Sequence, residues 1–177
     1  YIDRNHGNIG LFGRIEYATI ENLTVAGEIQ GDNAEIGGIV GYVLGSNQIS
    51  NCISEVNIIA NDSDVGGIVG KATSYGKEIY NCINKGTISL TCGLDNAIGG
   101  IIGYGINVTI IDSQNYGKLT IETNEEILNK GNLVGNQYLD LIENCTNYGE
   151  IIVTNNEIIT EACYIGGIAG YLGKTAL

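Results

Sequence analysis

The chain has 177 residues and a formal net charge of −12, and 44% of its residues are hydrophobic. An acidic surface repels phosphate backbones, which argues against a nucleic-acid-binding protein. The sequence contains no apolar run of about eighteen residues and therefore predicts no membrane-spanning helix. Glycine accounts for 27 residues and proline for none, which favours strands with glycine corners and uninterrupted hydrogen-bond ladders.

A four-residue signature, in which two apolar residues stand between glycines, recurs along the whole chain. In chain order its copies are 10–13, 38–41, 67–70, 100–103, 132–135 and 167–170, with Asn132 replacing a glycine in the fifth. The closing glycines are 28 to 35 residues apart. A period in this range is typical of proteins built from stacked repeats.

Two further short apolar segments follow each of the first five signatures. The second segments, at 20–23, 49–52, 79–82, 110–113 and 141–145, contain an Asn or Asp near their end. The third segments begin at Ile29, Ile58, Ile88, Leu119 and Ile151. Segments this short and this rich in Ile and Val suit strands better than helices. The sequence therefore predicts an all-β fold, a right-handed, β-helix-like parallel β-solenoid of about six coils of 28–35 residues, with residues 1–177 as one domain.

The stacking of coils predicts columns of equivalent side chains. One apolar column is Leu11, Ile39, Ile68, Ile101, Leu133 and Ile168, and the next is Phe12, Val40, Val69, Ile102, Val134 and Ala169. Strict alternation along a strand would expose the second column. We expect the closing glycine to bend the chain so that both columns face inward, the alternative being an apolar outer strip.

Asparagine occupies two further columns. Asn22, Asn51, Asn81 and Asn144, with Asp112 in the fourth repeat, precede an inward position, and Asn84, Asn115 and Asn147 each lie two residues before a glycine. Stacked amides can hydrogen-bond to each other and to the backbone of a corner. We expect both columns to be structural ladders.

The cysteines and acidic residues are not arranged as a metal or catalytic site. Cys52, Cys82 and Cys145 share one inward column and are expected to be buried free thiols, whereas Cys92 and Cys163 lie in loops where pairing stays open. His6 is the only histidine, which argues against zinc. The loop 61–64 has oxygen ligands for calcium but no closing bidentate acid, so a solvated turn is favoured. We expect no bound metal and no cofactor.

Catalysis by carboxylates alone would require two or three of them on one face. Asp112, Asp140 and Glu143 are the candidates, and nothing in the repeat pairs them convincingly. The sequence therefore predicts that the chain is not an enzyme.

Tyrosines recur at the position that follows the signature. The residues there are Arg14, Tyr42, Lys71, Tyr104, Asn136 and Tyr171, and Tyr116 and Tyr148 form a second short stripe. Regularly spaced aromatic side chains suit an extended ligand. Tyr42, Tyr104, Tyr171, Tyr116 and Tyr148 are the candidate ligand-binding residues, for a host or matrix glycan or protein, although exposed tyrosines that contact nothing are a simpler interpretation.

The signature, the Ile-x-Asn-Cys or Ile-x-Asn-Leu strand and the later Asn-x-Gly turn resemble the GLUG repeat of bacterial surface proteins. Residues 8–13 followed by 18–23 are the most similar copy. Such repeats accompany secreted or wall-anchored proteins, including adhesin-like proteins and non-catalytic regions of immunoglobulin A1 metallopeptidases. The resemblance implies a secreted or cell-surface location.

Two functions are compatible with this resemblance. The first is a non-catalytic extracellular repeat module of a bacterial surface protein, with a role in adhesion or as a spacer. The alternative is an accessory region of a secreted peptidase or glycan hydrolase whose catalytic domain lies outside this chain. Because the sequence starts and stops within coils, we expect it to be a fragment of a longer protein.

Overall fold

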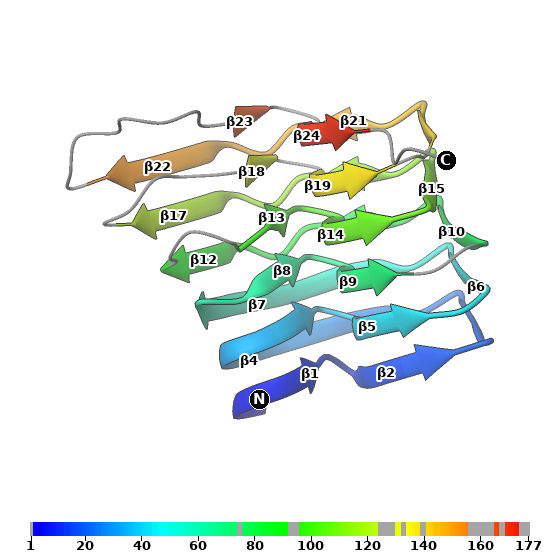
Figure 1. Ribbon diagram of the computed structural model, residues 1–177, viewed down its shortest axis with the longest axis horizontal. Coiled ribbons are helices and arrows are strands. Elements are labelled where there is room, and N and C mark those ends of the chain that lie inside the picture. Colours follow the sequence, from blue (N-terminus) through cyan, green and yellow to red (C-terminus); the bar gives the residue numbers. More distant parts are fainter. Residues whose placement is uncertain are drawn as a thin grey trace.

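The computed structural model describes residues 2–73, 76–91, 96–123, 130–131, 134–138, 141–155, 165–166 and 169–173. These residues contain strands that pair in parallel as a β-solenoid, which confirms the predicted fold class (Figure 1). About four turns are present rather than the six predicted. Parts of the last two repeats lie outside the described residues.

The strands form three sheets, one for each side of the coil. The first sheet contains β1 (Ile2–Ile9), β4 (Thr24–Gly37), β7 (Ile53–Asn61), β8 (Asp64–Gly66), β11 (Ile83–Asn84), β12 (Ile88–Thr91), β13 (Ile98–Gly99), β16 (Gln114–Asn115), β17 (Leu119–Thr123), β18 (Lys130–Gly131), β21 (Thr146–Asn147), β22 (Ile151–Asn155) and β23 (Ile165–Gly166). The second contains β2 (Phe12–Glu16), β5 (Val40–Leu44), β9 (Val69–Thr73), β14 (Ile102–Ile106), β19 (Val134–Tyr138) and β24 (Ala169–Gly173). The third contains β3 (Thr19–Glu21), β6 (Asn47–Ser50), β10 (Lys77–Tyr80), β15 (Val108–Ile111) and β20 (Ile142–Glu143).

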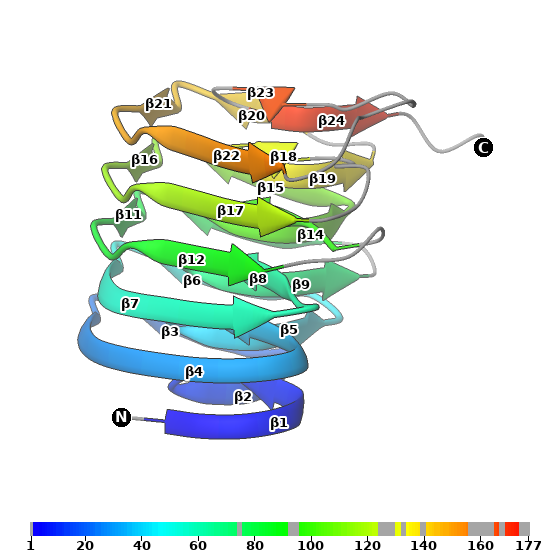
Figure 2. The ribbon, with the colours of Figure 1, turned by 90° about the vertical axis from the view of Figure 1, so that its left-hand side faces the viewer.

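The views in Figures 1 and 2 show these sheets wrapped around one axis, with the N-terminal strand β1 at one end of the stack and β24 at the other. Side chains along β7 alternate between buried and exposed, as the period of a strand requires. Among the described residues, no helix is long and apolar enough to cross a membrane.

Both apolar columns that follow the first glycine face inward in the middle of the stack. Ile68 and Val69 are each 0% exposed, and Ile39, Ile101, Val40, Ile102 and Val134 are equally buried. Both columns thus face inward as predicted, but the chain bends at the first glycine and the apolar residue after it, at 38–39 and 67–68, whereas the closing glycines Gly41 and Gly70 lie within β5 and β9, so the predicted position of the bend is wrong. Leu11 and Phe12 differ, because they are 50% and 40% exposed. Their coil contains β2, the end strand of its sheet, so one side of the coil has no strand packed against it. Leu133 and Ile168, and the side chain of Ala169, lie outside the described part of the chain.

Truncation of a residue in the middle of the first column is expected to be costly. Replacing Ile68 with alanine should destabilise the fold by about 2–5 kcal/mol, because the cavity has no solvent-exposed side through which to collapse. Leu11→Ala is the matched control, since half of that side chain is already exposed. Denaturant unfolding followed by circular dichroism would measure both losses. Equal losses at the two positions would contradict the inward column.

The corner asparagines adopt the left-handed conformation. Backbone φ is 58° at Asn22, 54° at Asn51, 50° at Asn81, 51° at Asp112 and 53° at Asn144. Asn and Asp tolerate this conformation better than other residues with side chains, which explains why the column is restricted to them. Their side chains are largely exposed, and the Nδ2 of Asn81 donates to the Oδ1 of Asn51 at 2.8 Å.

The second asparagine column is a buried ladder. Asn84 Nδ2 donates to Asn115 Oδ1 at 2.8 Å, and Asn115 Nδ2 donates to Asn147 Oδ1 at 3.0 Å. Each amide also closes its own turn: Gly117 N–H donates to Asn115 Oδ1 at 3.1 Å, and Asn115 Nδ2 donates to the carbonyl of Gly117 at 3.0 Å. The predicted ladder is confirmed, and it lies inside the solenoid wall.

The thiol column also has a hydrogen-bonding role. Cys52 Sγ donates to the carbonyl of Ser50 at 3.1 Å, and Cys82 Sγ donates to that of Tyr80 at 3.4 Å. In the fourth repeat the hydroxyl of Ser113 takes this role and donates to the carbonyl of Ile111 at 3.0 Å. The carbonyl that precedes each of these left-handed corners already accepts a backbone N–H from the neighbouring coil, and the thiol or hydroxyl donates a second hydrogen bond to it.

The three thiols of this column are free, but they are not equally buried. Cys52 and Cys82 are 0% exposed, whereas Cys145 is only partly buried, so the prediction that all three are inaccessible is wrong for Cys145. Cys145 lies in a coil whose inward neighbours are themselves partly exposed. Cys92 and Cys163 lie outside the described residues, and their pairing stays a prediction.

Labelling with a thiol reagent should follow this order of exposure. In native protein we expect Cys145 to react first, while Cys52 and Cys82 stay unmodified until a denaturant is added. The hydrogen bond with Cys52, together with burial, raises the pKa of the Cys82 thiol and keeps it in its unreactive protonated form, whereas the same hydrogen bond lowers the pKa of Cys52 to about 7, so Cys52 is protected from the reagent by its burial alone. Peptide mapping by mass spectrometry would assign each label. Rapid native labelling of Cys52 and Cys82 would contradict the buried column.

Candidate ligand-binding surface

The tyrosine stripe consists of Arg14, Tyr42, Lys71, Tyr104, Asn136 and Tyr171, one residue from each strand of the second sheet. The strand register pairs each of them directly with the next. The residues therefore follow one line along the front sheet in Figure 1, about 4.8 Å apart. The side chains of Asn136 and Tyr171 lie outside the described part of the chain.

The described tyrosines of the stripe are already engaged by neighbouring coils. The guanidinium of Arg14 lies 5.7 Å from the centre of the Tyr42 ring, and the amine of Lys71 lies 5.1 Å from the centre of the Tyr104 ring. The hydroxyl oxygen of Tyr42 lies 2.5 Å from that of Thr73, and either can be the donor. Both rings are only partly exposed. Cation–π contacts of this kind stabilise the stack and occupy ring faces that a ligand would need.

Lys71 connects the stripe to Asp64, the last residue of the calcium-like loop, and to Glu35, which the sequence analysis did not single out. Its Nζ lies 3.0 Å from Asp64 Oδ2 and 3.7 Å from Glu35 Oε1. Burial of the amine opposes its charge, but the two carboxylates outweigh this effect and raise the pKa of Lys71 above its usual value. The charge of Lys71 is therefore neutralised by these two carboxylates, and the surface around Lys71 has no net attraction for an anionic ligand.

Residues of the calcium-like loop, 61–64, take part in the same network of contacts around Lys71. Asp64 Oδ1 accepts a hydrogen bond from the backbone N–H of Ala97 at 3.0 Å, and its other oxygen binds Lys71. Ser63 Oγ accepts from Ala34 N–H at 3.1 Å and donates to the carbonyl of Asn61 at 2.6 Å. Within the described residues, no group of three or more His, Cys, Asp and Glu side chains is placed to hold a metal ion.

The two tyrosines of the second short stripe, Tyr116 and Tyr148, stack on each other. The ring centres of Tyr116 and Tyr148 are 4.6 Å apart and the ring planes differ by 13°. The rings are 48% and 62% exposed, and Tyr116 Oη donates to Gln114 Oε1 at 2.9 Å. Each ring therefore covers one face of the other. The sequence predicted these two positions as candidates but did not predict the stacking.

Two of the three acidic candidates, Asp112 and Glu143, lie in the described part of the chain, at neighbouring positions of adjacent coils. Asp112 lies at a left-handed corner, where its N–H donates to the carbonyl of Glu143 at 3.0 Å. Glu143 pairs with Ile111 of the coil before it, at an exposed position. Asp140 lies outside the described residues.

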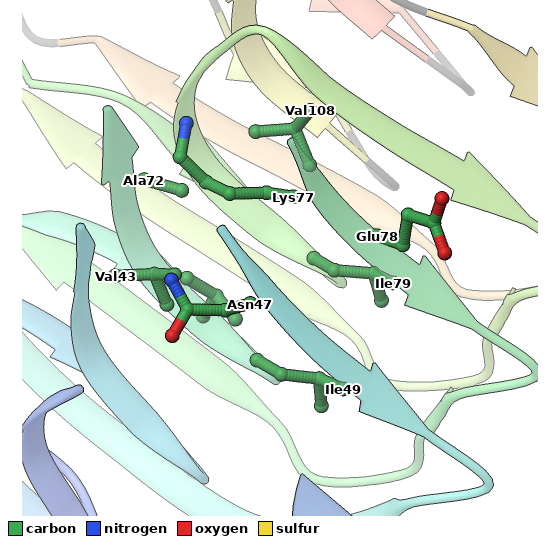
Figure 3. Close-up of a pocket in the computed structure, with 9 residues that line it drawn as sticks. Val43, Asn47, Ile49, Ala72, Lys77, Glu78, Ile79 and Val108 are labelled. Carbon is green, nitrogen blue, oxygen red and sulfur yellow. The ribbon is translucent and has the colours of Figure 1, made fainter. Parts of the chain in front are cut away.

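An internal cavity lies between the second and third sheets (Figure 3). It is lined by Val43, Asn47, Ile49, Val69, Ala72, Lys77, Glu78, Ile79 and Val108. Its volume is about 10 Å³, enough for one water molecule at most. Lys77 is 3% exposed, and its Nζ donates to the carbonyl of Ile106 at 2.6 Å. The buried amine thus connects neighbouring coils.

Comparison with known proteins gives one similarity. The chain is 29% identical over 167 residues to an immunoglobulin A1 protease of Streptococcus sanguinis, a match that covers 92% of the chain and 9% of that protein. The chain thus spans about a tenth of the length of this relative. No family model matches the chain. No solved structure matches it either.

Proposed function

We propose that the chain is a non-catalytic module of an extracellular bacterial protein and that it acts as a rigid spacer. The observation that carries this proposal is the unbroken parallel register of the second sheet from β2 to β24. Several outward side chains are paired with those of adjacent coils. In the tyrosine stripe, Arg14 and Lys71 lie over tyrosine rings. Elsewhere, Lys85 Nζ lies 3.0 Å from Glu55 Oε1, and Lys118 Nζ lies 3.4 Å from Glu150 Oε2. A surface whose charged and aromatic side chains already bind one another suits a structural role.

The extracellular location rests on the similarity to an immunoglobulin A1 protease. Immunoglobulins occur outside cells, so a protease that acts on one of them also acts there. The resemblance of the glycine signatures to the GLUG repeat supports the same location and a surface protein as the parent. In this proposal, the solenoid is an accessory region that holds a catalytic domain at a distance.

Adhesion through the tyrosine stripe is the competing role, and the register of Tyr42, Tyr104 and Tyr171 supports it. Its partner would be a host or matrix glycan or protein. The variant in which all three tyrosines are replaced by alanine separates the two roles on glycan and matrix-protein arrays. A spacer predicts that the variant and the parent bind equally; loss of binding by a folded variant would establish adhesion.

The absence of catalysis is tested separately. The purified chain should leave immunoglobulin A1 intact after prolonged incubation, as judged by gel electrophoresis. Cleavage that persists after repeated purification, and that is lost when Asp112 and Glu143 are replaced by Asn and Gln, would overturn the non-catalytic proposal.

A further inference from the structure

The outer surface is hollowed at the corner where the third sheet begins. The Tyr17 groove, as we name it, is formed by Tyr17, Thr19, Ser46, Gln48, Gly76 and Glu78 together with adjacent backbone. It is a shallow hollow of about 500 Å³ that is widely open to solvent. None of the tyrosine-stripe residues lines it.

The groove exists because the corner side chain becomes smaller over the first three coils, before Asn107 takes this position in the fourth. Gly76 and Ser46 immediately precede the paired residues Lys77 and Asn47, so they occupy equivalent positions. Tyr17 is the equivalent residue in the first coil, two positions before Thr19, which pairs with Gln48. The side chain at this position is a phenol at Tyr17, a hydroxymethyl group at Ser46 and a hydrogen at Gly76. This decrease leaves open space beside the ring of Tyr17.

Tyr17 is held with its ring in solvent. It is 75% exposed, and its backbone φ of 52° lies in a region that bulky residues rarely adopt. Gly45 of the next coil has a φ of 76°, which by itself favours glycine, and it also leaves room for the ring: a Cβ at that position would lie 3.0 Å from Tyr17 Cε1 and 3.1 Å from Cζ. The exposed ring of Tyr17 thus belongs to a residue with a left-handed backbone and lies against a glycine of the next coil.

Three polar side chains line up beside this ring. Thr19, Gln48 and Glu78 pair in register on β3, β6 and β10, and all three are exposed. Successive side chains in such a row are about 4.8 Å apart. They offer a hydroxyl, an amide and a carboxylate, which together can donate to and accept from neighbouring hydroxyl groups. Among the described residues of the groove, Glu78 is the only charged side chain.

We propose that the Tyr17 groove binds a neutral saccharide. The negative face of a tyrosine ring attracts the polarised C–H groups of a sugar ring, and the polar row supplies hydrogen bonds to its hydroxyls. The carboxylate of Glu78 and the net charge of −12 disfavour an anionic saccharide. This activity goes beyond a spacer role and uses a surface separate from the tyrosine stripe.

Solution NMR titration of the whole chain tests the proposal with lactose, maltotriose and triacetylchitotriose as neutral probes and 3′-sialyllactose as the anionic probe. We expect at least one neutral probe to shift the signals of Tyr17 and Gln48, and sialyllactose to bind more weakly than lactose. The proposal is overturned if no neutral probe shifts these signals or if sialyllactose binds more tightly than lactose.

Variants identify the groups responsible. Tyr17→Asn removes the ring but keeps a residue that tolerates the left-handed conformation, and it should weaken binding about tenfold. Gln48→Ala, at an exposed position outside the core, should weaken binding as well. Tyr80→Asn is the matched control, because Tyr80 is also exposed on β10 but does not line the groove. Glu78→Gln should retain neutral binding and improve sialyllactose binding. Unchanged affinity in folded Tyr17→Asn protein would overturn the proposal.

Discussion

Replacing Asn115 with alanine is expected to destabilise the solenoid by about 3–5 kcal/mol, one of the two largest effects of a single substitution. The amide is buried and bonds to Asn84, Asn147 and both backbone groups of Gly117. The alanine variant would leave several of these groups without a partner and inaccessible to water. Each buried unsatisfied group costs about 1–3 kcal/mol.

Urea unfolding of Asn115→Ala, followed by circular dichroism, would measure this loss. The matched control is Asn57→Ala, because Asn57 is exposed and accepts hydrogen bonds from the N–H and hydroxyl of Thr87. Water can replace the lost acceptor there, so the control should lose no more than about 1 kcal/mol. A loss at Asn115 as small as that at Asn57 would show that the ladder does not support the fold.

Replacing Gly66 with alanine is expected to prevent folding. A Cβ at this position would overlap the carbonyl oxygen of Val69 and lie 2.8 Å from the backbone nitrogen of Gly103. Both neighbours are backbone atoms of packed coils, so neither can move without breaking the strand register. The expected destabilisation is about 4 kcal/mol or more, at the upper limit for single substitutions.

The matched control for this glycine is Gly31→Ala. A Cβ there would lie 2.6 Å from Ile36 Cδ1 and 2.9 Å from Ile9 Cδ1, the ends of flexible side chains. We expect this variant to fold with a moderate loss of stability. Thermal unfolding of soluble protein would compare the two, and a Gly66→Ala protein as stable as Gly31→Ala would contradict the close approach of the coils.

The repeat made most of the fold predictable from the sequence. A position that recurs from coil to coil, such as Ile68 in the signatures or Asn115 in three successive coils, is constrained by similar neighbours above and below, so its period reveals its environment. The inward bend and the buried ladder follow from this constraint. The ends of the stack do not obey it: Leu11 carries the same signature as Ile68 but lies at an end strand and is half exposed.

Features that occur once could not be predicted in this way. The contacts of Lys71 with Asp64 and Glu35 join residues from different strands of the coil, and no period signals them. The Tyr17 groove depends on the difference between Tyr17, Ser46 and Gly76 rather than on their likeness. A search for columns in which side-chain size falls sharply between adjacent coils could have found it.

The parallel in-register stacking of coils is tested most directly by NMR couplings across backbone hydrogen bonds. Ile58 N–H donates to the carbonyl of Thr87 at 2.8 Å, and Ile88 N–H donates to that of Lys118 at 2.9 Å. We therefore expect a coupling from the nitrogen of Ile58 to the carbonyl carbon of Thr87 and from that of Ile88 to Lys118. Couplings to carbonyls displaced along the partner strand, or to an antiparallel partner, would contradict the register on which the columns, the stripe and the groove depend.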